Sequence, residues 1–440
     1  MELRAHRGFL ILTLLVVPGL AAQANPAAQL TLKQAADLAL KQNPDAQIAV
    51  LNFAESDQNK NLARSGLLPQ ADMRVSEQAE RANIAALFGR PFPGVPQHIG
   101  PFAVFQAGPT FSFPIFDLTA YRRWQEASRE TRASGHDVEN VREQIVLLVV
   151  SQYLGSLQAS ANVTAVQSQV QLAQALYDQA SDLQNHGVGT GLDTLRAHVE
   201  LQNQQQRLIE AQTQYKTSVY GLGRLLNLDP NRPIELTDQL SFFQTPEFPG
   251  DTTLQQAYAQ RPDMLALEER EREAELGRKL AREQRYPSLG FNGNWGYTGL
   301  GIESAIPTYT YTATIDVPLI TSGRIRAQVT KSDLELKKIE QTRDDLRNRI
   351  ALEVKTSLAQ LEAARHEVDV ANEGVKLAEE EVGQARDRFA AGVANNIEVI
   401  SAQDSLERAH NNQIAALYNY NQSRADLAHA TGHIQDLYAK

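Results

Sequence analysis

The sequence predicts a mainly α-helical chain with a smaller β component, built from two copies of one structural repeat. Residues 32–228 are repeated by residues 254–432. Equivalent residues in the two copies are offset by 204 or 205 positions, as in Pro114 and Pro318, Gly187 and Gly392, and Leu222 and Leu427. A unit of this length is too long for a solenoid, so it indicates one internal duplication. Each copy combines two short alternating segments with a very long helical segment.

Each copy contains one long segment without proline, at residues 119–186 and 323–391. At 1.5 Å per residue, each forms a rod on the order of 100 Å long. Apolar residues recur every seven positions, which predicts a supercoil. The second copy shows this most clearly, at Val354, Leu361, Val368, Val375, Val382 and Phe389. A glycine turn and a second helical segment follow each rod, so we expect helical hairpins over residues 119–227 and 323–431.

Two shorter segments in each copy alternate between apolar and polar residues, which is the period of a β-strand. They cover residues 69–77, 107–116, 287–297 and 309–319. Each is about long enough to cross a bilayer when tilted. Their aromatic residues gather near strand ends, as in membrane barrels.

Four such strands are too few to close a membrane barrel within one chain. Lipid offers no hydrogen-bond partner to open sheet edges, and the smallest membrane barrels have about eight strands. The chain must therefore oligomerise: three copies would give a 12-stranded barrel, which the hairpins would extend as an α-helical barrel. The alternatives are a soluble β-subdomain for the strands and a plain coiled-coil spacer for the seven-residue repeats.

The first 24 residues have the features of a secretory signal peptide. Arg4 and Arg7 give a positive start, an apolar stretch follows, and Ala22-Gln23-Ala24 is a cleavage site. The apolar stretch is too short to remain as a membrane span, and no later segment approaches the length of a transmembrane helix. We therefore expect export from the cytoplasm without a helical anchor.

The remaining organisation follows from these elements. Residues 25–228 form the first repeat, residues 229–253 an irregular connector in the equatorial region of the helices, and residues 254–432 the second repeat, before a tail at 433–440. Residues 81–106 are rich in Pro and Gly and predict a long loop between the first two strands. A surface loop and a lid over the pore both fit this segment.

The composition excludes several classes of protein. The chain has no cysteine, which excludes disulfides, thiolate metal sites, cysteine nucleophiles and a lipidated cysteine. A formal net charge of −10 without a basic block argues against nucleic acid as a partner. With 42% hydrophobic but only 7% aromatic residues, the composition suits long packed helices better than one large globular core.

The residues together resemble the TolC-like outer-membrane efflux protein family. The resemblance covers essentially the whole mature chain. It includes the duplicated layout, the proline near a strand end in each copy, and the motif Arg388-Phe389-Ala390-Ala391-Gly392 followed by Val399-Ile400-Ser401-Ala402-Gln403. Many members carry a lipidated cysteine, and this chain departs from them in that respect.

The resemblance implies a homotrimeric channel in the outer membrane of a Gram-negative-type envelope, extending into the periplasm. Such a channel is the passive exit duct of a tripartite efflux or type I secretion system. Its partners are a periplasmic membrane-fusion adaptor and an inner-membrane pump of the RND, ABC or MFS type. The cargo, the particular pump and the resting open or closed state stay open at this stage.

The hairpin tips are the expected functional sites. Asp193 and Glu398 occupy equivalent places, and a trimer brings six carboxylates to the periplasmic mouth, where such rings select for cations. The resemblance implies a pore constriction there, and Ser401 stands where some relatives have a second acid. Acidic residues in a first helical turn also offset the helix dipole, so both interpretations stand.

The resemblance further implies that the adaptor contacts the turns of these tips. The expected contact residues are Gly187, Val188, Gly189, Ala391, Gly392 and Val393. Glycine in a tight turn also has a purely conformational role, because it tolerates positive φ.

The sequence indicates no enzyme and no cofactor. It has no Gly-rich phosphate loop, nucleophile elbow or convincing triad order. His429 and His433 lack a third ligand, so we expect no metal there. The acidic runs 268–275 and 379–381 are expected to be solvated helix faces. A periplasmic coiled-coil adaptor and a secreted enzyme are the competing interpretations, but adaptors have one hairpin flanked by soluble β-domains.

Overall fold

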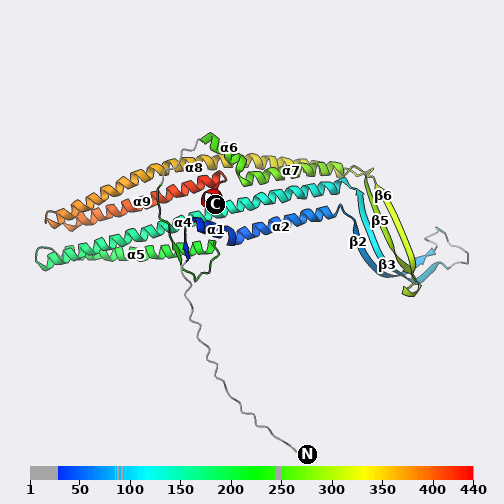
Figure 1. Cartoon of the computed structure of the whole chain (residues 1–440), viewed down its shortest axis with the longest axis horizontal. Helices are drawn as coiled ribbons and strands as arrows, with labels where there is room; N and C mark the ends of the chain where they lie inside the picture. Colours follow the sequence, from blue (N-terminus) through cyan, green and yellow to red (C-terminus); the bar gives the residue numbers. More distant parts are fainter. Residues whose placement is uncertain are drawn as a thin grey trace, which may run out of the picture.

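The computed structural model describes residues 28–84, 86, 89, 90, 93, 94, 96–242 and 250–439, so the expected signal peptide lies outside the described residues. The molecule is elongated (Figure 1). Two helical hairpins end side by side at one end, and an antiparallel sheet lies at the other. Two helices, α4 (Leu118–Asn185) and α8 (Arg324–Ala390), run from the sheet to the tips.

Each long helix has two shorter companions, one along each half of its length (Figure 1). Near the tips, α4 packs on α5 (Gly191–Leu225) and α8 packs on α9 (Asn396–Ala430). Near the sheet, α4 packs on α2 (Pro44–Ser65) and α8 on α7 (Pro262–Glu283). Because α7 also packs against α4, it joins the first repeat to the second.

A short helix precedes the companion helix nearest the sheet in each repeat, and we call the junction between the two the elbow. Helix α1 (Leu32–Gln42) meets α2 at Asn43, and α6 (Gly250–Gln260) meets α7 at Arg261. Both elbow residues precede a proline, which disfavours the helical region for them. They have nearly the same backbone angles, φ −63° and ψ 129° against φ −61° and ψ 125°.

The sheet has the strand order β2-β3-β5-β6, and all its pairs are antiparallel. Its strands are β2 (Gln70–Asn83), β3 (His98–Phe116), β5 (Ser288–Gly299) and β6 (Ile306–Asp316), with a 3₁₀ turn at Ile302–Ser304. The edge strands β2 and β6 lie far apart in sequence and pair on one side only within the described chain.

The predicted extent of the loop, residues 81–106, was wrong at both ends, because β2 reaches Asn83 and β3 begins at His98. Pairing between β2 and β3 continues as far as Asn83 and His98, beyond the last β3–β5 pair at Phe105 and Gly299. Proline belongs at edge strands or bulges, and Pro101 satisfies this rule because β3 has no β5 partner at that height. The expected second pair of strands also shifts, since β6 ends at Asp316 and not at residue 319.

The sheet has one polar and one apolar face, which follows from its register. Asp72, Thr110, Asn294 and Thr310 are consecutive cross-strand partners and line a hollow of about 380 Å³. The apolar face carries exposed large side chains from all four strands: Met73, Val75, Phe113, Ile115, Trp295, Tyr297, Tyr309 and Tyr311. No helix within the described residues is long and apolar enough to cross a membrane.

The largest apolar cluster lies in the middle of the molecule, where α1, α4, α5, α9 and α10 (Ile434–Tyr438) meet. Tyr153 is fully buried there and donates from its hydroxyl to the carbonyl of Leu30 and to Asp238, each at 2.9 Å. The connector contains a strand that the sequence analysis missed. This strand, β4 (Ile234–Leu236), pairs in parallel with β1 (Ala28–Leu30).

The acidic run at residues 268–275 is not the solvated face that the sequence suggested. It belongs to α7, which packs between α4 and α8, so both sides of this helix meet other helices. Glu269 is buried and is paired with Arg129 of α4 and Arg272. The run at residues 379–381, in contrast, is exposed as expected.

Candidate functional site at the hairpin tips

Both hairpins turn through a glycine in the left-handed region. Gly187 has φ 75° and Gly392 has φ 73°. The same pair of backbone hydrogen bonds closes each long helix. The longer-range bond of the pair runs from Val188 N–H to the carbonyl of Leu183 in the first hairpin, and from Val393 N–H to the carbonyl of Arg388 in the second. This is the Schellman arrangement that glycine favours at a helix C-terminus. The tips are therefore equivalent in backbone as well as in sequence.

The expected adaptor-contacting residues lie at the outermost points of these turns. The side chains of Val188 and Val393 are 75% and 67% exposed, although valine is usually buried. Gly187, Ala391 and Gly392 are also exposed. Gly189 has a conformational role, since a Cβ there would lie 2.9 Å from the backbone nitrogen of Gln184.

Asp193 lies in the first turn of α5 and is satisfied within its own turn. Its carboxylate accepts from the Thr190 hydroxyl at 2.6 Å, and its backbone N–H donates to that hydroxyl at 3.2 Å. Arg196 lies 4.0 Å from the carboxylate. The helix-terminus interpretation of this residue is therefore supported by its contacts.

Glu398 lies in the first turn of α9 and has a partner on a different helix. Its carboxylate accepts from Nε of Arg388, near the end of α8, at 2.8 Å. The ion pair spans the turn and reduces the negative charge that Glu398 presents. Ser401 lies one helical turn further along α9 and is exposed.

The two tips are joined by Asn396, which the sequence analysis did not single out. This residue is fully buried at the start of α9 and donates to the backbone carbonyl of Asp193 at 2.9 Å. The carboxylates of Asp193 and Glu398 have separate partners and do not share one. Nothing in the sequence distinguishes Asn396 from the neighbouring cap residue Asn395, because its role depends on the first hairpin lying beside it.

A second polar link between the hairpins lies further from the tips. Glu407 of α9 accepts from Gln204 of α5 at 3.2 Å and forms an ion pair with Arg207 of the same helix. An apolar cluster contributed by α4, α5, α8 and α9 surrounds the region between these links: Leu176, Ala180, Ala197, Ala378, Val382, Ala385, Phe389, Val399, Ala402 and Leu406. The tip region is therefore one packed unit of four helices.

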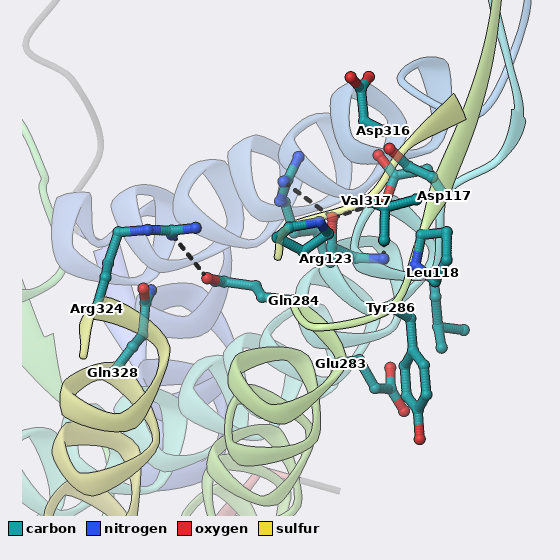
Figure 2. A pocket seen from close by; sticks show the side chains of 14 residues that line it. Asp117, Leu118, Arg123, Glu283, Gln284, Tyr286, Asp316, Val317, Arg324 and Gln328 are labelled. Atoms are coloured by element: carbon teal, nitrogen blue, oxygen red, sulfur yellow. Dashed lines mark hydrogen bonds between the residues drawn. The ribbon is translucent and has the colours of Figure 1, made fainter. Parts of the chain in front are cut away.

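At the opposite end of the helices a polar pocket of about 590 Å³ lies where the sheet meets them (Figure 2). Arg324, the first residue of α8, donates to Gln284 at the end of α7 at 3.1 Å. Asp117 caps α4 through the backbone N–H groups of Thr119 and Ala120. Burial acts to raise the pKa of its carboxyl, but the hydrogen bond from the Thr119 hydroxyl, together with the two backbone bonds, outweighs burial and lowers the pKa. The pocket holds residues of both repeats, so it is a structural joint.

The described residues contain no group of three or more His, Cys, Asp or Glu side chains that could hold a metal ion. His429 is half-buried near the Arg261 elbow, and this burial, followed by the charge of Arg261, lowers its pKa. Nδ1 of His433 donates to the carbonyl of Thr431 at 2.9 Å. The two histidines thus have separate structural surroundings.

Comparison with known proteins relates this architecture to characterised channels. The chain is 22% identical over 388 residues to the alkaline protease secretion protein AprF of Pseudomonas aeruginosa, covering 86% of this chain and 79% of AprF. It is 24% identical over 316 residues to the pyoverdine export outer membrane protein OpmQ of Pseudomonas putida, covering 70% of this chain and 65% of OpmQ.

The fold is that of a solved outer membrane channel. The CmeC channel of Campylobacter jejuni superimposes with a TM-score of 0.78 at 20% identity, covering 92% of this chain and 86% of CmeC. The outer membrane efflux protein family matches residues 35–228 and 253–433, which are the two repeats. The predicted family resemblance, duplicated helical fold, outer-membrane location and export function are confirmed. The chain belongs to the outer membrane efflux protein family.

Proposed function

We propose that three copies of this chain form the exit duct of a tripartite export system. The sheet carries the main support for this proposal. Within the part of the chain that the structure describes, the sheet has two edges without a partner strand, one polar face and one apolar face. Membrane strands must close into a barrel because lipid leaves edge groups unsatisfied. Pairing β6 of one copy with β2 of the next satisfies the backbone hydrogen-bonding groups of both edges. In the closed barrel the polar face lines the interior and the apolar face contacts lipid.

The tips are the entrance of this duct. Asp193 and Glu398 lie in the first turns of the two return helices, Ser401 lies one turn further along α9, and three copies bring six carboxylates to the mouth. Because Arg388 is paired with Glu398, the ring of carboxylates is less negative than the count of acids suggests. We infer a moderate preference for cations, since rings of carboxylates attract them.

A periplasmic adaptor is the expected partner at the tips. The exposed valines Val188 and Val393, one beside each turn glycine, give the tips apolar contact points that water does not favour. Such residues fit the hydrophobic contacts of a helical adaptor hairpin. The inner-membrane pump supplies the energy, and the duct itself needs no catalytic group.

The cargo is a small molecule or a protein. AprF is named for secretion of alkaline protease and OpmQ for export of pyoverdine, so similar ducts serve both classes. Glutamine, asparagine and serine are frequent on the return helices, as in residues 202–206, which suits a polar and unselective wall.

Conductance across a planar bilayer tests the proposal directly. The purified protein is compared with the double variant Asp193→Ala/Glu398→Ala, and Glu379→Ala, which changes an exposed acid on α8, serves as the matched control. We expect a small cation-selective conductance that becomes larger and less selective only in the double variant. If the conductance and its selectivity are unchanged in the double variant, the hypothesis of a carboxylate gate is rejected and that of a duct is retained. A well-folded trimer without conductance, even after Gly187→Ala and Gly392→Ala loosen the tips, contradicts the duct.

A further inference from the structure

The helices next to the sheet form a row in the order α2, α4, α7, α8 (Figure 1). Helix α4 packs on both α2 and α7, and α7 packs on both α4 and α8, so α2 and α8 are the two outer members of the row. The sheet has the same order, since α2 leads into the edge strand β2 and the edge strand β6 leads into α8. Each edge of the sheet therefore continues into an outer helix.

The internal duplication relates each outer helix to an inner one. Helices α2 and α7 each have 22 residues and begin at Pro44 and Pro262, so equivalent residues lie 218 positions apart. Helices α4 and α8 run without a break to the tip glycines, so equivalent residues there lie 205 positions apart. A contact of α4 with α7 therefore corresponds to a contact of α8 with α2. One chain does not make this second contact, because its α2 and α8 lie on opposite edges of the row.

The contact between α4 and α7 joins the two repeats and has a definite register. Near the sheet, Arg122 of α4 binds Glu283 of α7 through two hydrogen bonds of 2.8 and 2.9 Å. Further from the sheet, Asp137 of α4 forms an ion pair with Arg270 of α7. Because α4 runs away from the sheet and α7 runs toward it, the two helices are antiparallel. The two ion pairs therefore fix which residues of α4 and α7 lie at the same height.

The equivalent positions on the outer helices are polar or small and carry no charge. The ion pair near the sheet corresponds to Ala327 of α8 and Ser65 of α2. The ion pair further from the sheet corresponds to Thr342 of α8 and Asn52 of α2. All four residues are exposed in the single chain. A contact between α8 and α2 in this register therefore lacks both ion pairs and depends on other side chains.

The face of α2 that corresponds to the covered face of α7 is an exposed apolar stripe. On α7, Glu269 forms an ion pair with α4 and is 7% exposed, and Ala266, one turn away on the same face, is fully buried. The equivalent residues of α2 are Ile48 and Leu51, which are 53% and 66% exposed. Leu62, which is 68% exposed, continues the stripe toward the sheet, because residues spaced by three, four or eleven positions share one face of a helix.

The corresponding face of α8 is exposed as well. Leu334, which is 55% exposed, lies where α4 has Arg129. Lys338, one turn further along, is exposed and lies where α4 has the fully buried Ala133. In the register given by the two ion pairs, Lys338 lies level with Glu55, an exposed acid on the apolar stripe of α2. A contact between the two faces thus pairs opposite charges and covers apolar side chains.

We propose that the outer face of α2, formed by Ile48, Leu51, Glu55 and Leu62, is the docking surface for α8 of a second copy of this chain. We call this face the α2 seat. Helix α8 of the second copy lies antiparallel on it, as α7 lies on α4 within one chain. The inference rests on the proposed trimer, in which pairing of β6 with β2 of the next copy brings these two helices side by side. It goes beyond that proposal because it names the helices that join neighbouring copies, their register and the side chains that they bury.

Chemical cross-linking tests the α2 seat, because the chain has no cysteine and introduced thiols are therefore the only ones. Two double variants place cysteines at matched heights: Ser65→Cys with Ala327→Cys, and Asn52→Cys with Thr342→Cys. The purified full chain in detergent is treated with a short bifunctional maleimide, since a disulfide demands a narrower geometry. On a denaturing gel we expect covalent dimers and trimers from both variants.

The matched controls exchange the partners and use the same four cysteines. Ser65→Cys with Thr342→Cys, and Asn52→Cys with Ala327→Cys, separate the two thiols by roughly 20 Å along the helices, so these variants should not cross-link. All four sites are exposed, so the substitutions leave the packing of the single chain intact. Equal cross-linking of matched and exchanged pairs overturns the proposal, because random collision then accounts for the product.

Light scattering and planar-bilayer conductance of the same samples separate this inference from the proposed duct. A conducting trimer whose matched pairs do not cross-link overturns the α2 seat and leaves the duct standing. A cross-linked trimer that does not conduct supports the α2 seat and contradicts the duct. A protein that stays monomeric contradicts both, since no second copy then reaches α2.

Discussion

The elbow of the first repeat is held by Asn43, whereas the elbow of the second is held by Arg261. Both side chains donate to the last carbonyl of their return helix, Asn43 to Leu225 at 2.9 Å and Arg261 to Ala430 at 3.3 Å. The acceptors are equivalent residues, 205 positions apart. The same hydrogen bond therefore forms at both elbows, although its donor is an amide in one and a guanidinium in the other.

The charged elbow has a larger network than the neutral one. Asn43 additionally accepts from the N–H of Asp45 as a helix cap. Arg261, which is 7% exposed, is bound by Asp263 at 2.7 Å and by Glu353 of α8. An amide is satisfied by two neutral hydrogen bonds, but a buried guanidinium needs carboxylates. The two repeats thus share the backbone angles of the elbow and the hydrogen bond to the return helix. They differ in the groups that satisfy the donating side chain.

The largest expected effect is the loss of the charged elbow. Arg261→Ala leaves Asp263 and Glu353 without their counterion and should cost about 3 kcal/mol of unfolding free energy. Asn43→Ala removes a cap and one hydrogen bond and should cost about 1–2 kcal/mol. Both are measured by denaturant titration followed by circular dichroism. Arg349→Ala, which breaks an exposed pair with Asp345, is the control and should change little. Equal losses at the two elbows would show that the charge network contributes nothing beyond the shared contact.

The tips should behave alike, in contrast to the elbows, because their backbone conformation is shared. Gly187→Ala and Gly392→Ala each force a side chain into the left-handed region, at about 1–2 kcal/mol. Hydrogen exchange at the tips should therefore increase about equally in the two variants. Gly374→Ala is the control, since this glycine lies inside α8 with open space around it. That variant should be neutral or more stable by up to about 1 kcal/mol. A control as destabilised as the tip variants would exclude a conformational cause.

The smallest effect on stability is expected from the ion pairs of the tips. Arg388→Gln frees Glu398, and Arg196→Gln removes a weaker contact with Asp193. Exposed pairs contribute about 0–1 kcal/mol, so both variants should fold normally. The reversal potential in a salt gradient should nevertheless show greater cation preference for Arg388→Gln than for Arg196→Gln. The opposite order would mean that Asp193, and not Glu398, controls the charge of the entrance.

Much of the fold was predictable because its signals are local. The long helices follow from proline-free seven-residue repeats, and all six heptad residues named for the second copy are buried, Val354 and Phe389 among them. The breaks at Asn43-Pro44, Gly187 and Gly392 follow from the chemistry of proline and glycine. Strand lengths were less predictable, since pairing between β2 and β3 extends past Pro101 at an edge that no local pattern identifies.

The site was predictable only in part, for a related reason. Position beside the tip glycines singled out Asp193 and Glu398, and the structure gives each of them a local partner. Asn396 and Glu407 were missed because their partners lie more than 190 residues away, on the other hairpin. The acidic segment of α7 was misjudged for the same reason. Charge alone suggests solvent, and only the neighbouring helices α4 and α8 determine which of its glutamates are paired and buried.

The sequence by itself determined the repeat, the lengths of the helices, their turns and the family. These properties depend on backbone preferences and apolar periods that are encoded within a few residues of each position. The tertiary structure alone decided which polar groups meet across the two repeats. Those contacts set the partner of Arg261, the bridge from Asn396 to the first tip, and the ion pair between Arg207 and Glu407. Their energies depend on burial and on neighbouring charge, which exist only once the helices have packed.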